Sequence, residues 1–163
     1  MLAEQVFTQE GRKYVKGSKA TRCSFAYLEN PDISGVDGRL RIKAHFTGRS
    51  AAKLFGGCVG LGDSFDASIS AIPYYQDGVM RLRDVRVESR DKDGLYIRRV
   101  RAALADSLSK EFAYRIAEDA KRIPESRPEK ASYSQQLVRF HVAEIRVTAE
   151  SLVLAVEFAV AVR

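Results

Sequence analysis

The segment from Gly94 to Ile123 constrains the fold more than any other part of the chain, because its apolar residues recur at helical spacing. Thirty helical residues would span about 45 Å, and Pro124 is expected to end the helix. From Leu104 onward the apolar spacing is four residues rather than 3.6, so the apolar stripe turns by about 40° at each step. Such a winding stripe suits a helix wrapped by a curved sheet.

On both sides of this segment apolar residues alternate with others at the period of β-strands. The last strand is apolar on both faces, which is typical of a central or doubly covered strand. Residues 2 to 16 are predicted as a short helix, and the glycine-rich stretch from 50 to 63 as a mobile loop. Strands are predicted at about 21 to 29, 40 to 46, 65 to 72, 79 to 87, 140 to 147 and 152 to 162.

The strand at 79 to 87 changes the phase of its alternation. Met80 and Leu82 share one parity, whereas Val85 and Val87 have the other. A one-residue bulge near Asp84 would bring all four side chains to one face and bend the strand. Bent strands are typical of strongly curved sheets, and the penultimate strand shows a similar change of phase.

Size and charge limit the classes of protein to consider. The chain has 163 residues, 45% of them hydrophobic and 29% charged, with a formal net charge of +6. We expect one domain over residues 1–163, with an N-terminal segment (1–18) of uncertain structure. No apolar run approaches the ~18 residues of a membrane span, and the N-terminus carries no signal-like apolar region. The expected location is the periplasm or cell envelope if an export signal has been removed, and otherwise the cytoplasm.

The sequence contains none of the common catalytic motifs of hydrolases, zinc proteases or P-loop proteins. His45 and His141 fall on the polar side of their strands, without acidic residues at metal-ligand spacing. The glycine stretch leads into a strand rather than a helix N-terminus, so it lacks the usual phosphate-binding geometry. We therefore expect no enzymatic activity, no catalytic residue, no metal site and no cofactor.

Two cysteines, Cys23 and Cys58, are too few for a disulfide scaffold or a zinc site. Two unlinked thiols are the favoured interpretation. The alternative is a single bridge, which an exported protein could keep oxidised.

Arginines gather between residues 81 and 101, where they form either a solvated face interleaved with acidic residues or a surface that attracts anions. Single-stranded nucleic acids require stacking aromatics among the basic residues, and the basic face of this strand has none. An anionic membrane surface is therefore the favoured partner, and nucleic acid is disfavoured. The candidate anion-binding residues are Arg81, Arg83, Arg86, Arg98, Arg99 and Arg101.

Large apolar side chains occupy the inward positions of the predicted strands and helix. They form either an ordinary core or the wall of a cavity that would hold an acyl chain. Leu54, Phe55 and Leu61 are expected at the rim of such a cavity, in a loop that either covers one end of it or touches a membrane, because an exposed loop has no need of apolar residues. The alternative is a loop packed onto the core by Phe55 and Leu61. The candidate ligand-binding residues are Phe46, Phe55, Leu61, Phe65, Ile69, Leu82, Leu104, Leu108, Phe112, Ile116, Val156 and Phe158.

The order of these segments resembles one unit of the tubular lipid-binding (TULIP) superfamily. The resemblance rests on Leu40–Arg49, Leu54–Gly57, Ala67–Tyr74 and Asp77–Val87, and extends over about residues 20 to 163. It is greatest to bacterial envelope lipoproteins with a BPI-like half-domain, many of uncharacterised function. The resemblance implies an α+β fold, in which a highly curved antiparallel sheet wraps around one long α-helix with an apolar groove between them.

Two functions follow as expectations. The resemblance implies non-enzymatic binding of a lipid or another hydrophobic small molecule in the groove between helix and sheet, in the bacterial cell envelope. The alternative is a structural or interaction protein with a filled core that associates through its sheet edges, for example as a homodimer.

Overall fold

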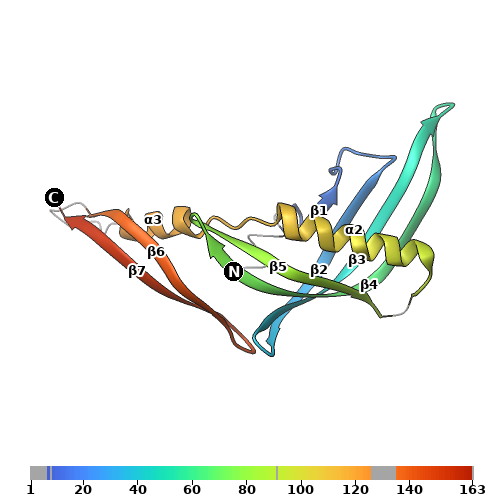
Figure 1. Cartoon of the computed structure of the whole chain (residues 1–163). Helices are drawn as coiled ribbons and strands as arrows, with labels where there is room; N and C mark the ends of the chain where they lie inside the picture. Colours follow the sequence, from blue (N-terminus) through green and yellow to red (C-terminus); the bar gives the residue numbers. More distant parts are fainter. Residues whose placement is uncertain (1–6, 8, 91, 126–134, 163) are drawn as a thin grey trace.

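The computed structural model describes residues 7, 9–90, 92–125 and 135–162. Figure 1 shows an elongated molecule in which strands predominate and two helices run along one side. In chain order the elements of the described residues are β1 (Arg12–Lys16), β2 (Phe25–Val36), β3 (Arg39–Leu54), β4 (Gly57–Gln76), β5 (Val79–Ser89), α2 (Leu95–Glu111), α3 (Ile116–Glu125), β6 (Gln135–Val147) and β7 (Leu152–Val162).

The strands form two antiparallel sheets. Five of them lie in the order β1-β2-β3-β4-β5, so each strand pairs with its neighbour in sequence, and β6 and β7 form a separate pair. α2 packs chiefly on β5, and α3 packs on β6. Figure 1 shows β3 and β4 extending beyond the other strands as a projecting hairpin, while β6–β7 extends from the opposite end of the molecule. The antiparallel pairing agrees with the sequence prediction.

The predicted long helix wrapped by a curved sheet is wrong. α2 ends at Glu111, α3 begins at Ile116, and most of the described chain is strand. The fold is therefore mainly β, with a curled antiparallel sheet and two short helices, rather than the α+β arrangement that the resemblance implies.

The helical segment is interrupted at Tyr114, because the backbone of this residue forms hydrogen bonds with the free edge of β5. Tyr114 N–H donates to Met80 O (2.9 Å), and Met80 N–H donates to Tyr114 O (2.8 Å). Phe112 accordingly has extended backbone angles, with φ −68° and ψ 118°. This pairing covers part of an open sheet edge, and the side chains of Phe112 and Ile116 on either side of it are both buried.

Two further predictions of local structure need correction. Part of the proposed helix over residues 2 to 16 is strand β1, which adds to β2; residues 1–6 and 8 lie outside the described part of the chain.

The proposed loop from 50 to 63 is strand, interrupted only by a turn at Phe55–Gly56. Gly60 permits this pairing, because a Cβ atom there would lie 2.2 Å from the carbonyl oxygen of Ser50. The polar stretch from 125 to 134 contains Pro128 and is predicted from the sequence as a loop; it falls almost wholly on residues outside the described ranges.

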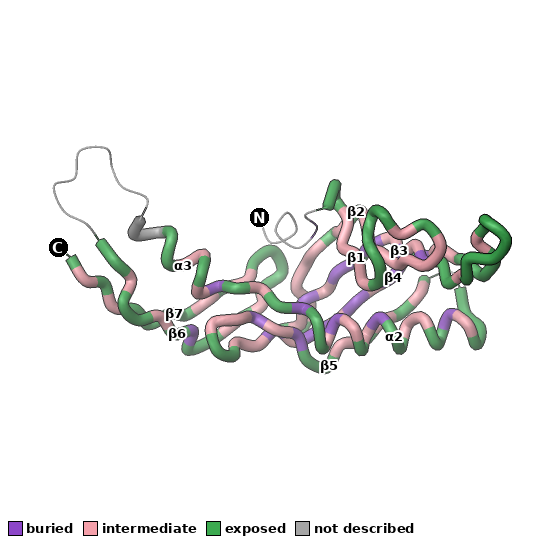
Figure 2. The backbone as a smooth tube through the Cα atoms, turned by 90° about the horizontal axis from the view of Figure 1, so that it is seen from above, coloured by how far each residue is buried: buried purple, intermediate pink, exposed green. Residues whose placement is uncertain are grey.

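The core lies between the inward face of the five-stranded sheet and the two helices. Figure 2 shows the buried residues along the middle of the strands and at intervals along α2. Ring contacts contribute at its centre, where the centroids of Phe46 and Phe65 are 4.9 Å apart. Its least exposed side chains are Leu28, Ile69, Met80 and Leu82.

β7 is not the central strand that its two apolar faces predict. Among the strands that the structure describes it pairs with β6 alone, and Phe158 is 61% exposed. The described strands of the β6–β7 hairpin do not pair with the larger sheet, but Val142 of β6 belongs to the same buried core, and at the hairpin turn Gly35 N–H of β2 donates to Ala149 O (3.0 Å). The apolar alternation correctly indicated a strand but could not specify its neighbours.

The predicted bulge in β5 is confirmed. The register between β4 and β5 shifts at this position, and Asp84 has a φ of 48°. Met80 and Leu82 are buried, while Val85 and Val87 pack against the same core. β6 also contains register shifts, as its change of phase indicated.

Asp84 links the bulge to the neighbouring strands through two arginines. Arg39 Nη1 donates to Asp84 Oδ2 (2.7 Å), and Arg39 Nη2 donates to the Asp84 carbonyl oxygen (2.6 Å). Arg86 Nη2 donates to Asp84 Oδ2 (3.1 Å). The hydrogen bonds from Arg39 and then Arg86 lower the pKa of the Asp84 carboxyl below its ordinary value.

We expect Asp84→Asn to destabilise the fold at neutral pH and to have little effect in strong acid. A lowered pKa means that the carboxylate stabilises the folded state above its unfolded pKa of about 3.9, and that this contribution disappears as pH falls through the lowered value. Asn tolerates the positive φ as well as Asp does, so the variant isolates the charge. Urea unfolding at pH 7 and pH 2.5 measures the effect, and an equal difference at both values would contradict it.

A disulfide joins Cys23, just before β2, to Cys58 in β4, with the two Cα atoms 5.2 Å apart. The favoured interpretation of two free thiols is therefore corrected. The bridge fastens the segment between β1 and β2 to the projecting β3–β4 hairpin, to which β1 makes no direct strand pairing.

Candidate functional site

An apolar hollow of about 330 Å³ lies between α2 and the first three strands, and we call it the groove. α2 lines it with residues spaced three or four apart, as expected for one face of a helix. The full lining is Val15, Lys16, Phe25, Ala26, Phe46, Gly48, Arg49, Ser50, Tyr96, Arg99, Val100, Ala103, Leu104, Ser107 and Glu111.

The floor of the groove is formed by core residues. Phe46 and Leu104 are buried, and Val100 packs partly against the same core. A Cβ atom at Gly48 would lie 2.6 Å from the ring of Phe46, so the glycine leaves space for that ring. The floor therefore presents apolar surface with fixed side chains.

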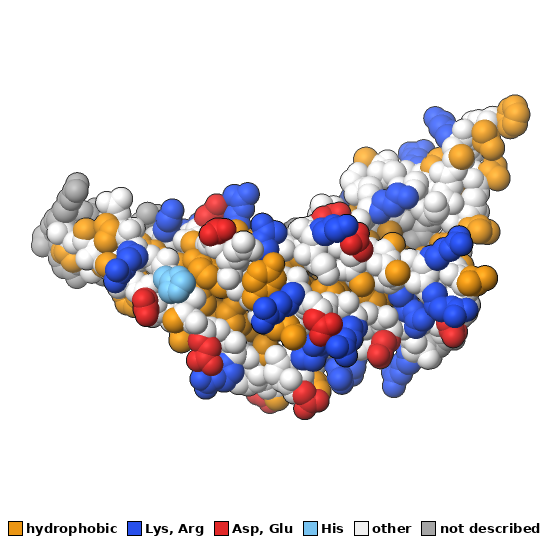
Figure 3. Space-filling model, viewed as in Figure 1, with side chains coloured by type: hydrophobic (Ala, Val, Ile, Leu, Met, Phe, Trp, Pro, Cys, Tyr) orange, Lys and Arg blue, Asp and Glu red, His pale blue; other side chains and the backbone are white. Residues whose placement is uncertain are grey.

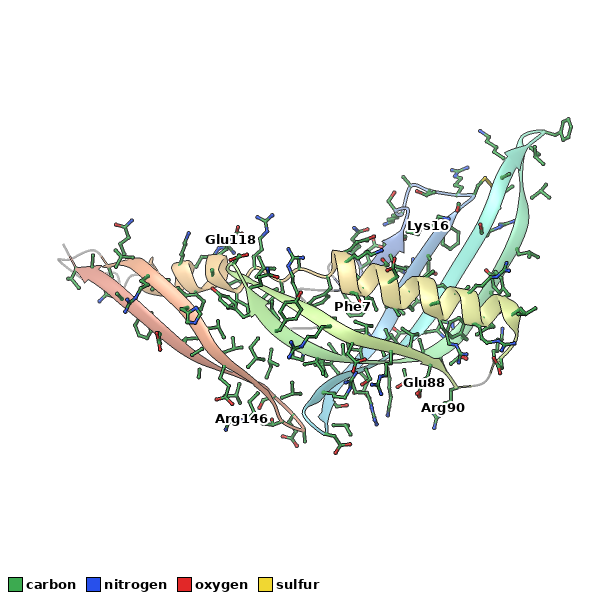
Figure 4. The ribbon with its side chains drawn as sticks, viewed as in Figure 1. Phe7, Lys16, Glu88, Arg90, Glu118 and Arg146 are labelled. Atoms are coloured by element: carbon green, nitrogen blue, oxygen red, sulfur yellow. A yellow bond between two sulfur atoms is a disulfide. The ribbon has the colours of Figure 1, made fainter. Side chains whose placement is uncertain are left out.

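The rim of the groove is mainly cationic. Lys16 and Arg99 lie there with a single acidic residue, Glu111; Arg49 also belongs to the lining, but its side chain has the outward parity of β3. Figure 4 shows Lys16 at the end of β1, above α2. Arg49 is held by its own strand pair, because its Nη2 donates to the carbonyl oxygen of Cys58 (3.1 Å). An apolar floor with a cationic rim matches a molecule that has an apolar tail and an anionic group.

The predicted ligand-binding residues are distributed over four regions, one of which is the β6–β7 hairpin. Phe46 and Leu104 line the groove, whereas Phe55 and Leu61 lie on the projecting β3–β4 hairpin, away from it. A further six are core residues: Phe65, Ile69, Leu82, Leu108, Phe112 and Ile116. Leu54 also lies on the hairpin, so the expectation that it and its neighbours form a cavity rim does not apply to the groove.

Val156 and Phe158 line a second apolar hollow of about 310 Å³ on the β6–β7 hairpin. α3 contributes only Ala120 to this hollow. No charged side chain belongs to its described lining, so it offers no group that would orient a ligand. We therefore regard the groove as the better candidate site.

The predicted anion-binding arginines do not form one continuous site. Arg99 reaches the groove rim. Arg98 and Arg101 lie 4.0 Å and 3.7 Å from Asp93, and Arg86 pairs with Asp84. Arg83 lies over the ring of Tyr74, 5.8 Å from its centroid, and Arg81 lies on β5 opposite Tyr74. The structure therefore supports the solvated-face alternative for several of these residues.

A third hollow, of about 550 Å³, is lined mostly by polar residues from the middle of β2, β3 and β4 and from the end of β5. Figure 4 shows two of its residues, Glu88 and Arg90, where β5 ends. His45 Nδ1 lies 2.8 Å from Asp66 Oδ1, a contact between neighbouring strands that sequence spacing did not reveal. The remaining lining mixes both signs of charge, so it favours neither anions nor cations.

Neither a metal centre nor a membrane-spanning helix is found in the part of the chain that the structure describes. Its His, Cys, Asp and Glu residues nowhere gather in a group of three or more suited to a metal ion. Its helices are too short or too polar to cross a bilayer.

Several groove residues were not identified from the sequence, notably Val15, Phe25, Tyr96 and Ala103. Val15 was missed because its segment was predicted as helix. Tyr96 and Ala103 follow the helical spacing of Val100, a signal that could have found them.

Comparisons of the chain with protein-family models, with curated proteins and with solved structures find no match.

Proposed function

We propose that this protein binds a hydrophobic molecule carrying an anionic group, such as a fatty acid or a phospholipid, without catalysing a reaction on it. The observation that carries this proposal is the pairing of an apolar floor with the cationic rim residues Lys16 and Arg99 in one groove. The tail would lie on Phe46, Val100 and Leu104, and the anionic group would meet the rim.

The size of the groove supports a single chain or a small amphipathic ligand. Its volume of about 330 Å³ lies at the lower end of the range for small-molecule sites. Burying an apolar tail makes the free energy of binding more favourable by roughly 25 cal/mol for each Å² of apolar surface removed from water. A carboxylate or phosphate bound by Arg or Lys adds charge-assisted hydrogen bonds, which fix the orientation.

We expect Ala103→Trp to weaken ligand binding at least tenfold, because an indole at this position would occupy the groove. Ala102→Trp is the matched control: Ala102 is also exposed on α2 but does not line the groove. Titration with a fluorescent fatty acid, together with native mass spectrometry of co-purified lipids, measures the difference. Equal binding by both variants, or no binding by the wild-type protein, would reject the groove as the site.

We further propose that the protein works in an oxidising compartment such as the periplasm or cell envelope. The Cys23–Cys58 disulfide supports this, because such bonds persist outside the reducing cytoplasm. Mass measurement of the protein with and without thiol alkylation, after isolation from its native cell fraction, tests whether the bridge is formed there.

A second candidate function is self-association through β7. This strand pairs with β6 alone among the described elements, and Val153, Phe158 and Val162 are exposed on it. A long apolar strand at a sheet edge favours pairing with another chain. Sedimentation velocity at several concentrations distinguishes the two candidates, since a dimer without co-purified lipid supports association rather than ligand binding.

A further inference from the structure

The tip of the β3–β4 hairpin, which we call the arm (residues 49–62), exposes apolar side chains that the fold does not use. Phe55 is 108% exposed relative to its reference state, and Leu54, Val59 and Leu61 are each at least half exposed. Figure 2 shows this end of the molecule as exposed chain, in contrast to the buried middle of β3 and β4. The four residues form one apolar cluster at the end of the arm.

The turn at the tip carries an unfavourable residue. Four tight turns among the described residues have positive φ at both central residues: Asp37–Gly38, Asp77–Gly78, Phe55–Gly56 and Glu10–Gly11. The first two use the Asp-Gly pair that such turns prefer. Phe55 adopts φ 49° although a bulky side chain is disfavoured there. The Phe55 ring makes no buried contact and its backbone is strained, so this residue does not contribute to the stability of the fold.

The two faces of the arm differ in chemistry. β3 and β4 pair here without a register shift, so Leu54, Val59 and Leu61 share the face that continues the inward side of the sheet. Arg49 and Lys53 have the opposite parity, together with the disulfide-bonded Cys58. The arm is therefore amphipathic, and the disulfide fastens its cationic face to the segment before β2.

The surroundings of the arm are positively charged. Residues 47–62 contain Arg49 and Lys53 and no acidic residue. Residues 11–28, which include β1 and the start of β2, contain five Lys or Arg and no acidic residue; among them, Arg12 pairs with Glu29 and Lys19 with Glu10. Figure 3 shows hydrophobic and basic side chains on the visible face of the arm, without acidic ones.

We infer that the arm docks on an anionic lipid bilayer, with Phe55 and its apolar neighbours inserted at the interface. Aromatic and aliphatic side chains enter the boundary between headgroups and acyl chains, and nearby basic residues are attracted to anionic headgroups. The arm has apolar side chains at its tip that can insert into this boundary, and basic residues behind the tip that can attract the headgroups. A soluble acidic partner would satisfy the charges but would leave the strained, exposed ring unexplained.

This inference rests on the arm alone and does not require a ligand in the groove. The two sites are nevertheless adjacent, because Arg49 and Ser50 at the base of the arm also line the groove. Docking through the tip would therefore bring the groove toward the membrane surface.

A single tryptophan provides the direct test, since the chain contains none. Phe55→Trp should show a blue-shifted emission on addition of vesicles of phosphatidylcholine mixed with phosphatidylglycerol, and the shift should decrease as salt is raised. Ala102→Trp, an exposed site on α2 outside the groove, is the matched control and should show no shift. The absence of a shift at position 55, or equal shifts at both positions, would overturn the inference.

Phe55→Asp separates docking from folding. We expect vesicle flotation to show more than a tenfold loss of binding, while the melting temperature stays unchanged or rises, because Asp-Gly is the pair that such turns prefer and occupies the turns at 37–38 and 77–78. Undiminished flotation of this variant would overturn the inference. So would Phe55-dependent self-association, measured by sedimentation, in place of vesicle binding. Groove variants such as Ala103→Trp should bind vesicles normally, so the two proposals fail independently.

Discussion

Removing the Cys23–Cys58 disulfide by the double substitution Cys23→Ser and Cys58→Ser is expected to lower the free energy of unfolding by about 4 kcal/mol. The bridge spans a sequence separation of 35 residues, and closing a loop of that size restricts the unfolded chain by roughly this amount. For a protein of this length the melting temperature should fall by roughly 8–15 °C. Thermal and urea unfolding measure both quantities.

The wild-type protein treated with a thiol reductant provides the control. It should unfold at the same temperature as the double variant, because both lack the same cross-link. Hydrogen exchange should also increase in residues 49–62, since the arm extends beyond the helix-covered core and loses its attachment to Cys23. If oxidised, reduced and substituted proteins all unfolded at one temperature, the bridge would have no stabilising role.

Gly35→Ala is expected to displace the turn of the β6–β7 hairpin from β2 and to destabilise the protein by about 3 kcal/mol. A Cβ atom at this position would lie 1.9 Å from the carbonyl oxygen of Thr148 and 2.6 Å from Val147 Cγ1. The carbonyl belongs to the backbone, so it cannot move away without shifting the turn, and overpacking of this kind typically costs 1–3 kcal/mol. The hydrogen bond from Gly35 N–H to Ala149 O would be lost as well.

Gly57→Ala is the matched control, because the nearest atom to its added Cβ would be 3.8 Å away and its φ is not positive. We expect it to leave stability unchanged within about 0.5 kcal/mol. In Gly35→Ala, hydrogen exchange should accelerate in β6 and β7 and stay slow in the middle of β3 and β4. Wild-type protection throughout β6 and β7 would show that the hairpin does not depend on this contact.

Local patterns predicted most strands because each depends on neighbouring residues. The alternation of Leu40, Ile42, Ala44 and Phe46 identified one face of β3, and all four are buried. The change of phase around Asp84 predicted the bulge, since a side-chain period of two allows no other way to keep both valines inward. Asp77–Gly78 forms the turn that this pair favours.

The candidate site was only partly predictable. Phe46 and Leu104 were identified because inward apolar residues of a strand and a helix must face each other wherever a groove forms. Lys16 could not be placed at its rim, since this requires the position of β1 relative to α2. The apolar tip was noticed from composition, but its paired strands and strained turn depend on close cross-strand contacts at Gly60.

The sequence by itself determined the strand periodicity, the bulge of β5, the chemical character of the arm and the excess of positive charge, because these properties belong to short segments. Only the tertiary structure decided where the helical segment breaks, which cysteines meet and which sheet receives β7. Tyr114 leaves the helix because the edge of β5 offers it two hydrogen bonds, and Cys58 reaches Cys23 because two strand pairings bring them to 5.2 Å. Such outcomes depend on competition between distant segments for the same hydrogen bonds and buried surface, which no local pattern records.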